Sequence, residues 1–111
     1  MILVQVTLEQ GILSRLLVSG HAPKESHSLL CNSVSCLTQT LIQSCISLIG
    51  KGIKQQSSSG KALLEIDVKE LSDSDVLRLD TLGKSYLLGL QGISKQEPGH
   101  LDIHLVEGSE K

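Results

Sequence analysis

A two-residue period marks the beginning of the chain. In residues 2–7, isoleucine and valine occupy every second position, as in a strand with one buried face. A Gln-Gly pair at residues 10–11 supplies a turn, and a second apolar run follows at residues 12–19. The pattern therefore predicts a β-hairpin at the start of the fold.

The period changes to three and four between about residues 29 and 49, which predicts a helix with one buried face. The apolar positions of this helix are Leu30, Val34, Leu37, Leu41, Cys45 and Leu48. Ser28 is the expected N-cap, which would put Cys31 in the first turn, where unpaired amides and the helix dipole favour a thiolate. At about 100° per residue, Cys31, Ser35 and Thr38 form a stripe on the flank of the apolar face. Cys36 should point away from the core.

The second half of the chain repeats the alternation of strand and helix. Residues 50–61 are rich in glycine, serine and lysine without an apolar period, so we expect a linker there. A half-solvated strand is expected at residues 62–68 and a second helix after the acidic start at 72–75. Its apolar stripe comprises Leu79, Leu82, Tyr86, Leu90 and Ile93. Pro98 and Gly99 end this helix, and a last strand follows.

The predicted order is thus ββαβαβ. Two amphipathic helices and four mostly one-sided strands are best satisfied when both helices pack on one face of a mostly antiparallel sheet. We therefore expect an α+β fold, with residues 1–111 forming a single domain.

Composition narrows the function classes. Tyr86 is the only aromatic residue and the formal net charge is -2, which argues against nucleic-acid binding by base stacking or by excess positive charge. The apolar start is too short to span a membrane and lacks the pattern of a secretion signal. Three cysteines cannot all pair within one chain. We expect a cytoplasmic protein with reduced thiols and no membrane association.

His21 and Cys31 are the candidate pair for catalysis. Gly20 and Pro23 predict that the strand ends at His21, on a strand-to-loop corner, while Cys31 lies at the start of a helix. A histidine that takes the proton of a thiol generates a better nucleophile. Ser35, one helical turn after Cys31, could offer its hydroxyl to a substrate, although a polar helix flank is the simpler interpretation from the residues alone.

Two metal-binding alternatives remain open. His21, His27 and Cys31 could be ligands of a metal such as zinc, but no fourth ligand is evident. His100, Asp102 and His104 share one strand face, where a solvated surface is the simpler interpretation. We therefore expect no metal and no cofactor.

The motifs GHA (20–22) and LCNSVSCLTQT (30–40) resemble the signature of the ribosomal-processing cysteine protease family, Prp, in which GHA is followed by a helix that opens with a pattern like VCAAVSALTQT. The resemblance implies that His21 and Cys31 form a catalytic dyad and that Ser35 contacts the substrate. It implies a homodimer that removes the N-terminal extension of a bacterial large-subunit ribosomal protein, number twenty-seven. Asn32 and Ser33 replace the usual alanines. An alternative is therefore a non-catalytic peptide-binding or ribosome-assembly module with the same fold.

Overall fold

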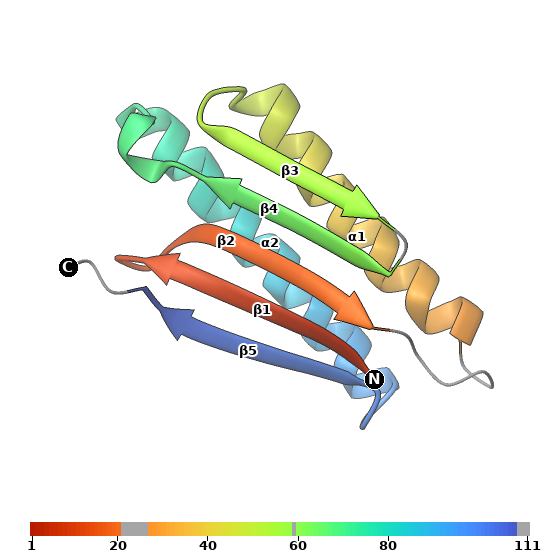
Figure 1. The fold of residues 1–111 in the computed structure, drawn as a ribbon. Coiled ribbons are helices and arrows are strands. Elements are labelled where there is room, and N and C mark those ends of the chain that lie inside the picture. Colours follow the sequence, from red (N-terminus) through yellow and green to blue (C-terminus); the bar gives the residue numbers. More distant parts are fainter. Residues whose placement is uncertain (21–26, 59, 109–111) are drawn as a thin grey trace.

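The computed structural model describes residues 1–20, 27–58 and 60–108, with residues 27–29 described by their backbone alone. The elements in chain order are β1 (Ile2–Glu9), β2 (Ile12–Gly20), α1 (His27–Leu48), β3 (Ile53–Ser58), β4 (Lys61–Ile66), the short 3-10 helix η1 (Val68–Glu70), α2 (Asp73–Gln96) and β5 (Leu101–Glu107). Both helices cover the same face of one mixed sheet, behind the strands in Figure 1. The α+β class and the one-sided packing of the helices are confirmed.

The sheet has five strands in the order β3-β4-β2-β1-β5, one more than the pattern predicts. Neighbouring strands are antiparallel except β1 and β5, which are parallel. The extra strand is β3, which occupies half of the segment expected to be a linker, so that expectation is wrong. All but the first of its residues are exposed, because β3 has a neighbour on one side only and forms a hairpin with β4. Its sequence therefore lacks an apolar period.

The predicted hairpin of β1 and β2 forms. Gln10 and Gly11 both have positive φ, 53° and 82°, which suits the two-residue turn that right-twisted strands require. Val4 and Val6 of β1 and Leu16 of β2 face the helices and are almost completely buried. The other face of the sheet carries the alternate residues and is open to solvent in the single chain.

The second helix begins and ends where the sequence places it. The Ser72 side chain accepts a hydrogen bond from the backbone N–H of Asp75 at 3.2 Å, as an N-cap does. Leu79, Tyr86 and Leu90 are buried against the sheet and α1. Gly89 permits close approach of the helices, because a Cβ at this position would lie 2.9 Å from Leu37 Cδ1. Among the described residues, no helix is long and apolar enough to cross a membrane.

Candidate active site

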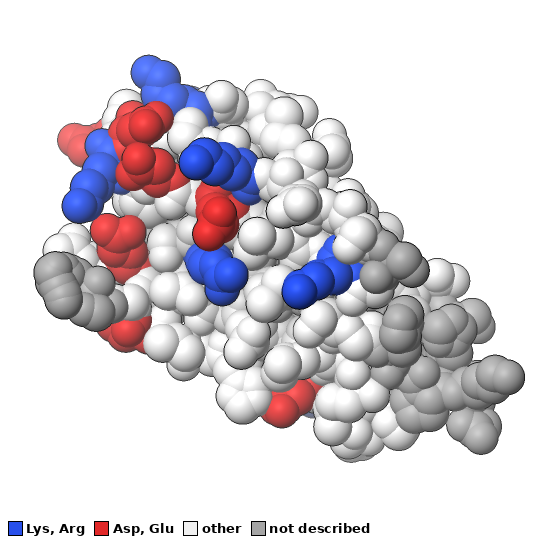
Figure 2. All heavy atoms as spheres, viewed as in Figure 1, with Lys and Arg blue, Asp and Glu red and all other residues white. Residues whose placement is uncertain are grey.

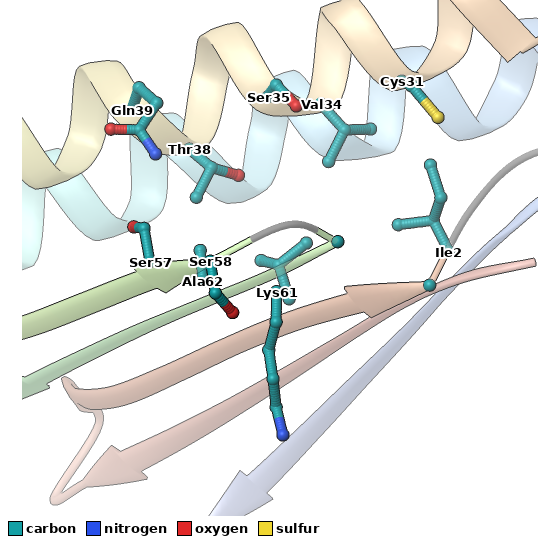
Figure 3. A pocket seen from close by; sticks show the side chains of 13 residues that line it. Ile2, Cys31, Val34, Ser35, Thr38, Gln39, Ser57, Ser58, Lys61 and Ala62 are labelled. Atoms are coloured by element: carbon teal, nitrogen blue, oxygen red, sulfur yellow. The ribbon is translucent and has the colours of Figure 1, made fainter.

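Cys31 lines a cavity of about 200 Å³ between α1 and the sheet, and its side chain is half-buried. Figure 3 shows its sulfur at one end of the row of α1 side chains that border the cavity. Ile2, from the start of β1, lies across from the thiol. The thiol is thus accessible at the end of a hollow lined by four strands and one helix.

The α1 wall of the cavity is the stripe that helical spacing predicts. Cys31, Ser35 and Thr38 all contribute to the lining, and Gln39 follows on the same flank. Thr38 is only 2% exposed, and its hydroxyl forms a 2.8 Å hydrogen bond with the hydroxyl of Tyr86 on α2. Tyr86 is itself buried, which raises the pKa of its phenol to about 12, partly offset by the bond to Thr38. This wall is therefore fixed from behind by the second helix.

The opposite wall comes from the hairpin of β3 and β4. Ser57 and Ser58 place small polar groups beside the cavity, and Ala62 adds an apolar surface. The Lys61 side chain also borders the cavity, but its ammonium group points away from α1 in Figure 3. Ser57, Ser58 and Lys61 could not be found from the sequence, because polar residues in a predicted linker carry no signal of a site.

Gly20 ends β2 and also lines the cavity. Its φ is +99°, and a Cβ at this position would lie 2.3 Å from the backbone oxygen of Met1. Only glycine fits this close approach of β2 to the start of the chain. The Gly20 N–H donates a 3.2 Å hydrogen bond to the oxygen of Gly60, which ties the end of β2 to the turn of the β3–β4 hairpin. The predicted strand-to-loop corner falls on His21, which lies outside the described residues.

His21 lies between β2 and α1, and His27 is the first residue of α1. His21 follows Gly20 directly but lies outside the described residues, so its place in a dyad stays a prediction. The backbone of α1 begins at His27, not after Ser28, so the expected N-cap is wrong. Cys31 is consequently the fifth residue of α1, and its own N–H belongs to the helical hydrogen-bond ladder. The amide of Cys31 is therefore not one of the unpaired first-turn amides that would favour a thiolate.

The other two cysteines lie where the helical pattern puts them. Cys36 is exposed and Cys45 is completely buried at the centre of the core. Burial raises the pKa of the Cys45 thiol to about 11, which keeps it protonated at neutral pH. Neither residue lines the cavity that contains Cys31.

No group of three or more metal-ligating side chains occurs among the described residues. The candidate cation site on β5 reduces to one contact, in which His104 Nε2 lies 2.9 Å from Asp102 Oδ2 on the exposed face. The zinc alternative depends on His21 and on the side chain of His27, both outside the described part.

Charge is unevenly distributed over the sheet face in Figure 2. Acidic and basic side chains gather at the upper left, where β3 begins and β4 ends. The cavity lies at the other end of β3, beside Ser57 and Ser58, and Ile2, Val34 and Ala62 give it an apolar part of its lining. Such a lining suits an uncharged segment of a ligand.

The model of the family Cysteine protease Prp matches residues 1–102 of the chain. The chain belongs to the cysteine protease Prp family. No curated protein matches the sequence. Among solved structures, the ribosomal processing protease Prp of Staphylococcus aureus with a substrate peptide superposes with a TM-score of 0.79 at 16% identity, covering 95% of this chain and 99% of that one.

Two further solved structures share the fold. The Staphylococcus aureus protease with a covalently linked product peptide gives a TM-score of 0.76 at 18% identity, with 95% and 99% of the two chains covered. A Streptococcus mutans protein gives a TM-score of 0.78 at 20% identity, with 97% and 96% covered. At such identities the superpositions establish the fold, whereas the family match identifies the chain as a member of a cysteine protease family.

Proposed function

We propose that this chain is a cytoplasmic, homodimeric cysteine endopeptidase that removes the N-terminal extension of bacterial large-subunit ribosomal protein number twenty-seven. The observation that supports it most is the position of Cys31, a half-buried thiol in a cavity that also contains Gly20, the residue before His21. A protein of the same fold from Staphylococcus aureus is a ribosomal processing protease that binds a substrate peptide. The family match extends over both motifs.

The size of the cavity favours a peptide over a cofactor. Small-molecule sites usually occupy about 300–1,000 Å³. The cavity beside Cys31 is about 200 Å³, which is room for one or two side chains of an extended chain. Its apolar lining suits an apolar side chain of the substrate.

In the proposed reaction, His21 takes the proton of the Cys31 thiol and the sulfur attacks the scissile carbonyl carbon. The tetrahedral intermediate collapses as the C–N bond breaks and His21 returns the proton to the leaving amine. Water, deprotonated by His21, then hydrolyses the thioester and regenerates the thiol. Ser35 lies one turn from Cys31 on the same wall, where its hydroxyl can donate to the substrate backbone. No metal or cofactor takes part in these steps.

Mass spectrometry of the extended ribosomal protein from the same organism tests the proposal. The unaltered chain and Cys36→Ala should make a single truncation, because Cys36 is exposed and does not line the cavity. Cys31→Ala should make none while keeping the unfolding midpoint of the parent. If neither the unaltered chain nor Cys31→Ala cleaves the extended protein but both bind it, the chain is a non-catalytic binding module and not a protease. Cleavage by Cys31→Ala would exclude Cys31 as the nucleophile.

A further inference from the structure

β3 is an edge strand whose outer side pairs with no other described strand, and it lies beside the cavity. β3 is the last strand of the sheet, and its six residues pair with β4 in one continuous register without a bulge. Edge strands of this kind are normally blunted by proline, bulges or inward charges, because they offer a template for another strand. The sequence of β3, IKQQSS, contains no proline and no inward charge. Its one charged residue, Lys54, lies on the outer face. No described segment of the chain covers this edge.

The backbone groups that point outward can be identified from the strand pairing. Gly20 N–H bonds to Gly60 O, and the β2–β4 register makes this a hydrogen-bonded pair. Hydrogen-bonded pairs alternate along an antiparallel ladder, so Lys61, Leu63 and Glu65 bond in the other direction, to β3. Their partners are Ser58, Gln56 and Lys54. The N–H and C=O groups of Gln55 and Ser57 therefore point away from the sheet.

One flank of α1 lies beside this edge. Ser35 and Gln39 border the cavity together with Ser57. The helical repeat places Ile46 on the same flank, two turns further along, and Ile46 is 40% exposed although it is a large apolar residue. An extended chain on the β3 edge would thus contact polar side chains and one exposed isoleucine before it reaches the thiol.

We propose that the substrate binds as a sixth strand on the free edge of β3, paired with Gln55 and Ser57, and extends from there to Cys31. This inference rests on the proposed protease function and specifies how its substrate is recognised. Main-chain hydrogen bonds to an edge strand give affinity without demanding particular side chains, a recognised mode of peptide binding. The occupant is therefore an extended peptide segment, with an apolar residue only near the cut.

The distance along α1 between Gln39 and Cys31 sets how far the paired segment lies from the scissile bond. Gln39 lies beside Ser57, and eight residues at 1.5 Å per residue separate Gln39 from Cys31, about 12 Å along α1. An extended peptide covers this distance in about four residues. The segment paired with β3 consequently begins about four residues from the scissile bond, where Ser57 borders the cavity.

The peptide is tested first, because its changes cannot affect folding of the enzyme. The probe is a synthetic peptide that contains the extension and the residues after the cut, with single backbone N-methyl groups placed four to seven residues from the scissile bond. N-methylation at every second position should raise KM about threefold to tenfold, as expected for one lost hydrogen bond, and leave kcat unchanged. The intervening positions should show no effect. Equal effects at all positions, or none, would overturn the proposal.

The enzyme offers a matched pair of variants. Gln55→Pro removes an outward N–H that is unpaired within the fold, and an edge strand tolerates proline at such a position. It should raise KM about threefold to tenfold above that of Gln55→Val, which removes the same polar side chain but keeps the N–H. Equal KM values for both variants would refute strand pairing. Failure of the parent to cleave the unmodified peptide would instead refute the proposed function, so the two failures are distinguishable.

Discussion

The hydrogen bond between Thr38 and Tyr86 provides the sharpest test of how the cavity wall is held. The two hydroxyl oxygens are 2.8 Å apart, and the residues are 2% and 4% exposed, so both hydroxyl groups are largely shielded from bulk water. Tyr86→Phe keeps the ring and leaves the Thr38 hydroxyl unpaired. Thr38→Val keeps the volume and leaves the phenol unpaired. Each change should lower the free energy of unfolding by about 1–3 kcal/mol, the cost of a buried group without its partner.

The double variant separates this bond from other effects. Once both hydroxyl groups are absent, no polar group is left unpaired, and the loss should be smaller than the sum of the single losses by about 1–2 kcal/mol. Urea unfolding of the four proteins at neutral pH, followed by far-UV circular dichroism, measures this difference provided that the denaturant slope is unchanged. Additive losses, within about 0.3 kcal/mol, would show that the two hydroxyls do not depend on each other and would refute the reasoning.

Three further outcomes follow from the structure. Gly20→Ala should destabilise the fold by at least about 3 kcal/mol, because a Cβ would lie 2.3 Å from the Met1 oxygen at φ +99°. Gly92→Ala should stabilise it by about 0.5–1 kcal/mol, since nothing lies within 4 Å and alanine favours the helix; thermal unfolding measures both, and the opposite sign at either site contradicts the packing. Stability should fall as the pH rises above 9, because the Cys45 thiol, with a pKa raised from its ordinary 9.0 to about 11, and the Tyr86 phenol, raised from 10.0 to about 12, ionise first in the unfolded chain. Cys45→Ala should flatten the decline between pH 9 and 11 in urea titrations, and an unchanged slope would assign the decline to other groups.

Periodicity predicts those elements whose side chains are sorted by burial. The stripe of α2 is buried on one side, and the pairing of Ser72 with the Asp75 amide is local, so both could be found from the sequence. Strand β3 could not, because its residues are exposed on both faces and its hydrogen bonds connect it to β4 rather than to a buried layer. The start of α1 was placed too late because a serine is a plausible cap wherever it precedes an apolar run.

The site was predictable on one wall only. Helical spacing is a local property, so Cys31, Ser35 and Thr38 could be placed on the same flank without knowing the rest of the fold. The opposite wall depends on the pairing of β4 with β2, strands that are far apart in sequence, which brings the β3–β4 hairpin and Ser57 close to the helix. Hydroxyl side chains in a polar segment contain no information about that register.

The two motifs differ in what they require of the molecule. At Gly20, the start of β1, the end of β2 and the turn of the β3–β4 hairpin meet, and a side chain at this position would collide with backbone, whose position the sheet fixes. Glycine is therefore needed there for the fold, whether or not the protein cleaves anything. A thiol at position 31 has no such structural necessity, because Cys31 is half-buried at the border of a cavity, where a small residue would also fit. The reactivity of Cys31, and not the presence of the glycine motif, therefore distinguishes a protease from a binding module built on this fold.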